Sequence, residues 1–389
     1  MTRLLERLLG RLPVGWLQLT HSRGRLAAAI AGVAFANVLV LVQLGVSGAL
    51  SGTIAQGYDL FRADLMISAP DANTMTEGGH VARQHLWQAL SEPDVTDGAA
   101  LYIGTLVWSR PGGDTTLQTF GIDPAHSGFL APGVAAGADA LALADRAIID
   151  IMTRDLDAGV LENVGVDAPL SFEAGGRSLH VTGTFRGGVG FSADGYMIVS
   201  DQTFLALFPR RHVGAPNHLL LRLAPGADPD VVAASLHDRL GGELRIRTLP
   251  DAIAADQRYQ GTERPTGIIF GFGVVIGILV GIVIVYQVLS TDVADHLREY
   301  ATFKAVGYPH RFFVGIILEE ALILAALGFL PGITVATALY AALNGATGLP
   351  MAMTWEVALA VFTGTLAACA LSGVIATRRL AAADPAELF

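Results

Sequence analysis

The sequence predicts an α-helical membrane protein with four transmembrane helices and a large mixed α/β extracytoplasmic domain between helices 1 and 2. Of its 389 residues, 52% are hydrophobic and 15% are charged, whereas soluble domains carry about 25% charged residues. Asp, Glu, Lys and Arg are absent from four runs of 33, 27, 35 and 21 residues, namely 26–58, 265–291, 321–355 and 357–377. Each run reaches the roughly 18–20 residues that cross a bilayer as a helix. Between 60 and 264 charged residues return at ordinary density.

Residues 1–25 are predicted to form an amphipathic helix at the cytoplasmic membrane interface. Leucines recur there at helical spacing, and Arg3, Arg7 and Arg11 follow beside them at four-residue intervals. This is the pattern of a helix that lies in the interface. The first transmembrane helix is then expected over 26–50.

Residues 51–264 are predicted to form the extracytoplasmic domain. The segment from Ala49 to Arg264 holds 26 acidic and 15 basic residues, a net charge of −11, and it is long enough for its own core. Many glycines and short apolar runs indicate a β-rich insertion at about 123–200. A strand over 217–223, a helix over 229–240 and a strand over 243–249 are expected to close the domain as a β-α-β unit.

The remaining chain is predicted to alternate between membrane and cytoplasm. Pro331 lies within the third apolar run, and because proline removes a helical hydrogen bond, a kink is expected near it. The expected segments are a second transmembrane helix at 267–290, a cytoplasmic helix at 291–311, a third transmembrane helix at 312–343, a fourth at 355–377 and a cytoplasmic tail at 378–389.

The basic residues predict the orientation. Lys and Arg occur in the N-terminal segment, in 291–311 and in the tail, whereas residues 343–354 contain none. Because basic loops stay in the cytoplasm, both termini are expected there. Cys369 is the single cysteine and lies in the fourth apolar run, so the exported domain has no disulfide. This pattern favours the inner membrane of a bacterium, with the domain in the periplasm.

Several classes of chemistry are not expected. The chain has a single lysine, Lys304, and its surroundings do not match the phosphate-binding loop of ATPases. The ten histidines are not clustered with cysteines or carboxylates as metal ligands are, and no serine-hydrolase or zinc-protease motif occurs. The sequence therefore predicts no catalytic residue, no cofactor and no metal. An acidic domain also argues against nucleic acid as a partner.

Gly273, Gly277 and Gly281 recur every four residues within the second apolar run. Small residues at this spacing allow close approach of another helix. The pattern fits packing within one protomer and a contact with a second copy equally well.

The segment 291–313 has the pattern of a short charged amphipathic helix between two spans. Gly307 and Pro309 are expected to end it. Such a helix can dock into a groove of a cytoplasmic partner or lie at the lipid interface, and the residues alone favour neither. One face carries Val293, Leu297 and Tyr300, and the other carries Asp295, Arg298, Glu299 and Thr302.

Residues 295–307 (DHLREYATFKAVG) resemble a segment of MacB/FtsX-type ABC transporter permeases, in which an Arg-Glu pair precedes a Lys-Ala-hydrophobic-Gly ending. The tail, with Arg378-Arg379 followed by Asp384-Pro385-Ala386, is similar to the closing signature of the same family. Residues 16–20 (WLQLT), 31–36 (AGVAFA) and 327–332 (LGFLPG) resemble the DevC subgroup most closely. The order of spans and outer domain matches along the whole chain.

The resemblance implies a non-catalytic, dimeric permease that works with separate ATPase subunits. It places contact with the ATPase on Arg298, Glu299, Phe303, Lys304 and Gly307. For the DevC subgroup it further implies a periplasmic adaptor, an outer-membrane channel and export of lipids or other amphiphiles. Tyr300 departs from the family pattern, because many relatives have an apolar residue after the Glu.

Two other interpretations stay open. The chain could be an FtsX-like permease that transmits a signal to a cell-wall enzyme, or a lipoprotein-releasing permease. It could also be a membrane-anchored binding or sensing protein without an ATPase. Neither the cargo nor the choice between homodimer and heterodimer can be inferred from the sequence.

Overall fold

The computed structural model describes the chain except for residues 1–13, 111–112, 157–158, 160, 162, 166–167, 189, 191–192, 297–298, 301, 304–305 and 383–389. The chain divides into two compact units. The helical unit consists of Met1–Gly48, Pro265–Thr347 and Met351–Phe389, and the sheet unit consists of Ala49–Arg264 with Gly348–Pro350. The predicted domain boundaries at 51 and 264 thus lie within two residues of this division.

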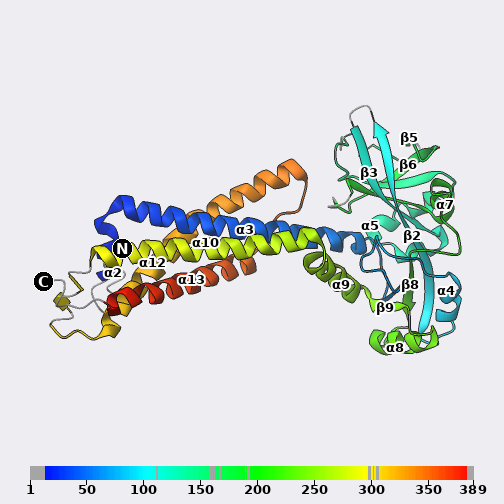
Figure 1. Ribbon diagram of the computed structural model, residues 1–389. Coiled ribbons are helices and arrows are strands. Elements are labelled where there is room, and N and C mark those ends of the chain that lie inside the picture. Colours follow the sequence, from blue (N-terminus) through cyan, green and yellow to red (C-terminus); the bar gives the residue numbers. More distant parts are fainter. Residues whose placement is uncertain are drawn as a thin grey trace. The chain divides into compact units, whose positions relative to one another are not determined.

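In the part of the chain that the structure describes, four helices are long and apolar enough to cross a membrane. With the mixed α/β unit between the first and the second of them, the predicted fold class is confirmed. Figure 1 shows the four helices gathered in one bundle. They are α3 (Arg23–Asp59), α10 (Pro265–Asp295), α12 (His310–Thr347) and α13 (Trp355–Ala382).

Helix α3 is longer than predicted. It was expected to end at Leu50, but it continues to Asp59 and so has 37 residues, about 55 Å at 1.5 Å per residue. Its last eleven residues belong to the sheet unit. Since no proline or charge interrupts the chain before Asp59, the helix passes the limit that the hydrocarbon thickness of about 30 Å suggests.

The other helix boundaries also differ in detail from the predictions. Of the N-terminal helix predicted over 1–25, the structure describes α2 (Val14–His21), which Ser22 separates from α3. Helix α12 is continuous across Pro331 and runs to Thr347 instead of 343, so the kink near Pro331 stays a prediction. Helix α13 extends to Ala382, into the predicted tail.

Helix α12 packs closely against α3. A Cβ on Gly328 would lie 2.5 Å from the Val33 Cβ, and a Cβ on Gly332 would lie 2.9 Å from the Asn37 Cβ. Real side chains cannot approach so closely, so these two positions require glycine. In lipid, where no hydrophobic force drives helices together, such small residues allow the van der Waals packing that associates them.

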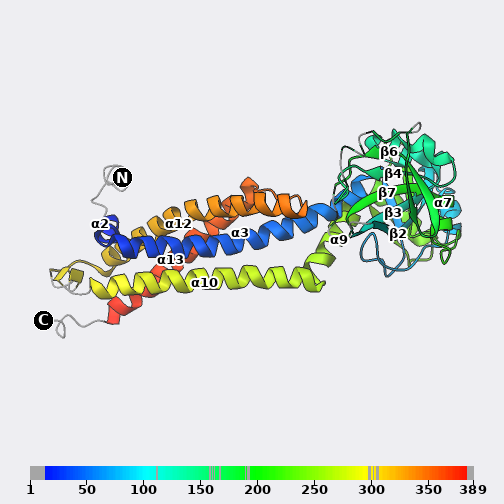
Figure 2. The same cartoon turned by 90° about the horizontal axis from the view of Figure 1, so that it is seen from above.

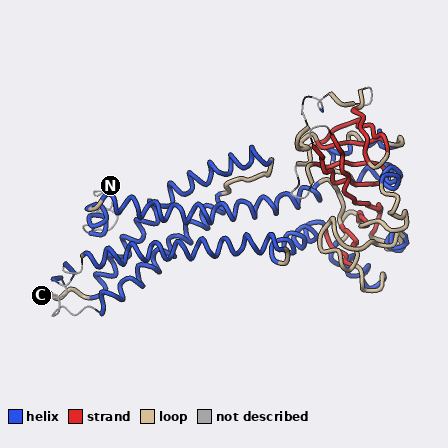
Figure 3. The backbone as a smooth tube through the Cα atoms, turned by 45° about the horizontal axis from the view of Figure 1, so that its top comes forward, coloured by secondary structure: helices blue, strands red, loops and turns tan. Residues whose placement is uncertain are grey.

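The described residues of the sheet unit form one nine-stranded sheet with the order β5-β6-β4-β7-β3-β2-β8-β1-β9. Figure 3 shows these strands in red. Their bounds are β1 (Leu65–Ser68), β2 (Val95–Arg110), β3 (Gly113–Ile122), β4 (Arg146–Asp150), β5 (Leu170–Ala174), β6 (Arg177–Phe185), β7 (Gly195–Ser200), β8 (His218–Leu223) and β9 (Arg245–Thr248).

The closing β-α-β unit consists of β8, α8 (Pro229–Arg239) and β9. Strand β1 pairs antiparallel with both β8 and β9, so it lies between the two strands that α8 connects. Asp228 caps the start of α8 by accepting a hydrogen bond from the Asp230 N–H, the usual role of aspartate at a helix N-terminus.

The predicted β-rich insertion at about 123–200 forms no sheet of its own. Strand β7 pairs parallel with β3 and antiparallel with β4, so β4 to β7 extend the main sheet. Every residue of β7 is buried, as expected for a strand covered on both faces. The sequence pattern could not reveal this, because strand pairing depends on partners far away in the chain.

Each face of the sheet carries its own hydrophobic core. Leu65 and Ile67 point into one core, and Met66 between them points into the other, because successive side chains of a strand alternate. The first core packs against α4 (Gln84–Ala89), α7 (Asp201–Leu207) and α8. The second packs against η1 (Pro124–Phe129), α5 (Pro132–Ala135), η2 (Ala138–Ala142) and α9 (Leu249–Thr262).

Candidate functional site

One end of the helical unit brings the N-terminal helices together with a segment that is far from them in the sequence (Figure 1). They are α2, the start of α3, and residues 296–309 between α10 and α12, here called the connecting segment. Arg25 of α3 forms an ion pair with Asp295 at the end of α10. The Tyr300 hydroxyl donates a hydrogen bond to Gln18 Oε1 of α2 at 3.1 Å. The connecting segment is therefore held against the N-terminal part of the chain.

Tyr300 anchors the connecting segment. Its side chain is 1% exposed, and its ring packs edge to face on Phe313 of α12 with a centroid distance of 5.7 Å. The hydroxyl at the end of this buried ring reaches α2. A buried tyrosine normally finds such a partner, which explains how a polar group fits where the family pattern has an apolar residue.

The opposite side of the connecting segment is exposed and partly aromatic. Phe303 is 39% exposed, Val306 73% and Tyr308 43%, and the rings of Phe303 and Tyr308 pack edge to face at 5.5 Å. Glu299 is exposed as well. We call Glu299, Phe303, Val306 and Tyr308 the coupling patch.

Gly307 ends the short helix of the connecting segment. Its φ of +102° lies in the left-handed region that favours glycine. The Tyr308 N–H donates to the Phe303 carbonyl at 3.1 Å, and the Val306 N–H donates to the Thr302 carbonyl at 3.1 Å. This six-to-one closure around a left-handed glycine is a Schellman motif, and it presents Val306 and Tyr308 at the exposed end.

Of the five predicted coupling residues, Glu299 and Phe303 are exposed and Gly307 forms the helix end. Arg298 and Lys304 lie outside the described residues. Gln18 of α2 was not predicted to take part. The sequence offers no signal for it, because its role depends on a contact with Tyr300 that spans 282 positions.

Helix α2 is itself fixed on α12. The Trp16 N–H donates to Glu319 Oε1 at 3.4 Å, and a Cβ on Gly15 would lie 3.0 Å from the Ile316 carbonyl oxygen. Glu319 and Glu320 are both buried, at the contact between the two helices. The connecting segment, α2 and α12 therefore form one packed assembly.

The glycine face of α10 lies against α3 of the same chain. A Cβ on Gly277 would lie 2.9 Å from Val40 Cγ2, and one on Gly281 would lie 3.1 Å from the Ala36 Cβ; Gly273 lies against the Gln43 amide. Packing within the protomer thus accounts for all three glycines. A dimer contact through this face stays a prediction.

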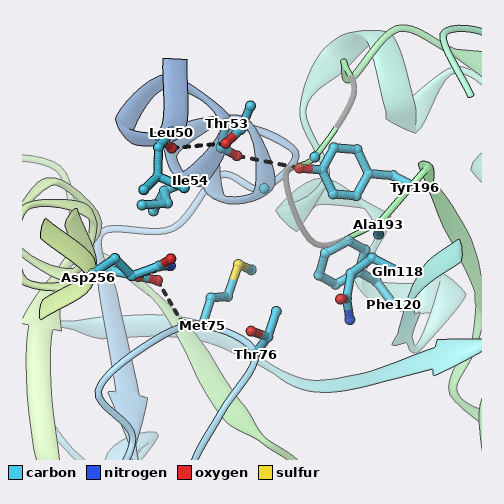
Figure 4. Close-up of a pocket in the computed structure, with 13 residues that line it drawn as sticks. Leu50, Thr53, Ile54, Met75, Thr76, Gln118, Phe120, Ala193, Tyr196 and Asp256 are labelled. Carbon is cyan, nitrogen blue, oxygen red and sulfur yellow. Dashed lines mark hydrogen bonds between the residues drawn. The ribbon is translucent and has the colours of Figure 1, made fainter. Parts of the chain in front are cut away.

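The sheet unit contains a small cavity of about 80 Å³ near the end of α3, shown in Figure 4. Asp256 of α9 lines it and is 2% exposed. Its Oδ2 accepts hydrogen bonds from the Tyr58 hydroxyl at 3.0 Å and from the Met75 N–H at 2.9 Å. Burial raises the pKa of this carboxyl, and Gln260 Nε2 donates to Oδ1 at 2.8 Å.

Two further polar groups are buried near this cavity. His218 Nε2 donates to the Met75 carbonyl at 2.8 Å, so Nδ1 accepts from the Ser68 hydroxyl at 2.8 Å. Burial lowers the pKa of His218 to about 4. Burial, followed by the charge of Asp150, raises the pKa of Tyr196 to about 12. These bonds tie the end of α3, the loop at Met75 and α9 together, which is a structural role.

Among the described residues, no three His, Cys, Asp or Glu side chains are placed to hold a metal ion together. The polar side chains around the cavity are bonded to backbone and to neighbouring side chains.

Comparisons with known proteins agree with this architecture. Residues 271–385, which cover α10 from its seventh residue, the connecting segment, α12 and α13, match the family model "FtsX-like permease C-terminal". The fold defines a multi-pass membrane protein with a mixed α/β domain after its first apolar helix. Residues 271–385 therefore form an FtsX-like permease C-terminal domain.

Solved structures of domains from other membrane proteins are also similar to part of this chain. The extracellular domain of the noncanonic ABC-type transporter YknZ from Gram-positive bacteria is 12% identical with a TM-score of 0.33, covering 48% of this chain and 99% of that chain. The periplasmic region of MacB from Actinobacillus actinomycetemcomitans is 10% identical with a TM-score of 0.34, and the match covers 50% of this chain and 92% of that chain. A permease-protein domain from Porphyromonas gingivalis is 16% identical with a TM-score of 0.31, covering 49% and 90%.

At these TM-scores the likeness by itself establishes neither a common fold nor a function. No curated protein matches the chain in sequence. The DevC subgroup therefore stays a resemblance, while the wider resemblance to FtsX-type permeases is confirmed by the family-model domain over residues 271–385.

Proposed function

We propose that this chain is a permease subunit that couples ATP hydrolysis by a separate ATPase dimer to movement of its outer domain. The observation that carries the proposal is the two-sided connecting segment, with Tyr300 buried and Phe303, Val306 and Tyr308 exposed. Exposed apolar groups with a charged neighbour are typical of a docking surface. A short amphipathic helix is a common ligand for a partner's groove.

The anchor at Tyr300 provides the path from docking to movement. A force on the exposed side of the connecting segment reaches α12 through Phe313 and α2 through Gln18. It reaches α3 through the ion pair of Arg25 with Asp295. Because a ligand shifts a conformational equilibrium only by binding one state more tightly, the ATPase must hold one arrangement of two such segments more firmly than the other.

The proposal extends to partners and location. A second permease copy would pair with this one, Arg298 and Lys304 would add positive charge to the ATPase contact, and the connecting segment and both termini would lie in the cytoplasm of a bacterium. The outer domain would then work with a periplasmic adaptor and an outer-membrane channel in the efflux of lipids or other amphiphiles. The charge asymmetry of the loops and the resemblance to the DevC subgroup support this.

The test is Phe303→Asp in the full chain, co-expressed with an ABC ATPase that copurifies with the parent chain. We expect the ATPase to be lost from the purified complex and stimulated hydrolysis to fall by about tenfold or more, since a buried interface aromatic is worth about 2 kcal/mol or more. Glu299→Arg should weaken the same contact.

The control is Phe272→Asp, which changes an aromatic on α10 outside the coupling patch that is more exposed than Phe303, at 64% compared with 39%. The control should retain the ATPase if it inserts. Normal copurification and normal stimulated hydrolysis in Phe303→Asp would refute the assignment of the coupling patch.

A further inference from the structure

A polar cavity and an apolar cavity follow each other along the groove between α3 and α10. Figure 2 shows these two helices running side by side, and Gly277 and Gly281 bring them into contact. The polar cavity, of about 400 Å³, lies at the start of α3. The apolar cavity, of about 250 Å³, lies further along the same two helices and is closed by α13.

The two cavities are lined by the same face of α3 and by the same face of α10, here called the stripes of these helices. On α3, Ala29 lines the polar cavity and Val33 lines the apolar one; on α10 the corresponding pair is Val288 and Val285. Each pair is separated by about one helical turn. The apolar cavity continues along the same stripes to Leu44 and Val274.

The walls of the polar cavity carry both signs of charge. Arg25 and the imidazoles of His21 and His296 lie beside the carboxylates of Asp295 and Glu299. An anion alone would meet two carboxylates there, and a cation alone would meet Arg25. A ligand with a phosphate and an amine a few bonds apart complements both.

Arg25 can bind such a phosphate without giving up its ion pair. One of its terminal nitrogens contacts Asp295, and a guanidinium has five N–H donors in a planar fork. About 45% of the Arg25 side chain is exposed, so further donors are accessible. Phosphate recognition by arginine is commonly bidentate.

The apolar cavity fits a hydrocarbon chain. Its walls are mostly aliphatic, with Val33, Val40 and Ile278 among them, and Asn37 and Thr365 are polar members of the lining. From Arg25 to Asn37 along α3 the distance is about 18 Å, comparable with one leaflet of a hydrocarbon core of about 30 Å. A chain attached to a head group at Arg25 would thus reach the middle of this cavity.

We propose that the groove between α3 and α10 binds one phospholipid with an amine-bearing phosphate head group, of the phosphatidylethanolamine type. The head group occupies the polar cavity between Arg25 and Glu299, and one acyl chain follows the stripes into the apolar cavity. The lipid lies beside the connecting segment, because His296 and Glu299 of that segment line the polar cavity. This inference does not depend on the proposed coupling to an ATPase.

The first experiment measures lipid retention by the purified full chain. The protein is reconstituted in vesicles with equal amounts of phosphatidylethanolamine and phosphatidylglycerol, extracted in mild detergent and examined by native mass spectrometry. We expect each chain to retain one phosphatidylethanolamine molecule, with a preference of about tenfold over phosphatidylglycerol. Arg25→Ala should lower its retention by about tenfold, the loss expected for a charge-assisted hydrogen bond.

Arg23→Ala is the matched control, because Arg23 lies two residues away on α3 and does not line the polar cavity. It should retain the lipid as the parent chain does. Since Arg25→Ala also removes the ion pair with Asp295, Glu299→Gln serves as a second variant. It keeps the size of the side chain and should shift the preference from phosphatidylethanolamine toward phosphatidylglycerol.

The second experiment locates the acyl chain. Phosphatidylethanolamine with a photoreactive group in mid-chain should label peptides that contain Val33–Leu44 and Ala360–Cys369. Gly364→Leu fills the apolar cavity, because Gly364 lines it with open space beside its Cα, and should abolish that labelling. Gly271→Leu, at an equally open glycine outside the cavity, should leave the labelling unchanged.

Equal retention of the two lipids, or equal loss in Arg25→Ala and Arg23→Ala, would overturn the proposal and indicate only unspecific boundary lipid. Labelling that spreads along the outer face of α10, around Ile269 and Phe272, would overturn it as well. Because these experiments use the purified chain without an ATPase, none of their results affects the coupling proposal.

Discussion

Helix α10 and strand β7 are both strongly apolar, yet their surroundings are opposite. Of the most apolar 18-residue stretch of α10, only 11% is buried in the protein. Ile269 and Phe272 of this helix are each 64% exposed. All six residues of β7 are buried. Apolar side chains that are left exposed on a long helix require lipid as solvent, whereas those of β7 are removed from water by two protein cores. The same residue types therefore serve two different solvents in one chain.

The helices of the bundle differ in the same way. Half of the most apolar 18-residue stretch of α12 is buried in the protein, compared with 11% of the same kind of stretch in α10. Helix α12 packs on α2, α3 and α13, through Gly15, Gly328 and Gly373 among others. Most of the surface of α10 is instead exposed in the chain. Burial thus distinguishes a helix that holds the bundle together from one that borders it.

The largest loss of stability is expected when a charged residue is introduced into the buried part of the sheet. Ile198 of β7 is 0% exposed, so Ile198→Asp would bury an unpaired carboxylate and lower the free energy of unfolding of the sheet unit by about 4 kcal/mol or more. Urea unfolding followed by tryptophan fluorescence measures this. Val213→Asp, at a position that is 55% exposed, should change it by less than about 0.5 kcal/mol. Similar stability of the two variants would contradict the two-core description.

A smaller effect should appear in the pH dependence of the sheet unit. His218 has its pKa lowered by burial to about 4, whereas in the unfolded chain it is about 6.5. Between these values the unfolded state binds the additional proton, so the free energy of unfolding falls as the pH falls from 6.5 to 4. The loss expected for this group alone is about 3 kcal/mol.

His218→Gln removes the titrating group and keeps a donor for the Met75 carbonyl. Its stability should depend on pH less steeply than that of the parent chain, and the difference between the two curves isolates His218, since the raised pKa values of Asp150, Asp201 and Asp256 are common to both proteins. Parallel curves over this range would refute the buried neutral state of His218.

The smallest effect concerns the two kinds of helix in the bundle. Gly328→Val would force a Cβ against Val33 and should destabilise the helical unit by about 1–3 kcal/mol. Gly271→Val, on α10 where the space is open, should be close to neutral. Thermal denaturation in detergent, monitored by circular dichroism, compares the two. Equal shifts in the melting temperature would mean that the space beside Gly271 is as tightly packed as the contact of Gly328 with Val33.

The elements of secondary structure were largely predictable, because their signals are local. Uncharged runs indicated the four spans, and the alternation around 217–249 indicated β8, α8 and β9. Gly307 also lies where the sequence predicted the end of a helix, since left-handed backbone conformation favours glycine. The continuation of α3 to Asp59 and the placement of β4 to β7 in the main sheet were not predictable, because they depend on contacts with distant segments.

The candidate site was predictable only in part. Amphipathic spacing and the family resemblance indicated Glu299 and Phe303, but not that Tyr300 would reach Gln18. The polar contacts around Asp256 also left no pattern in the sequence, because Tyr58, Met75 and Gln260 come from three separate elements.

By itself, the sequence determined that this is a membrane protein, where its helices lie along the chain, and which segment joins the second and third apolar helices. These features could be inferred because hydropathy and helix propensity act over short stretches of chain. Only the tertiary structure decided which glycines touch which helix, which side of the connecting segment is free, and that two cavities follow one groove. Those features arise from packing between residues hundreds of positions apart, and packing depends on shape in three dimensions rather than on composition along the chain.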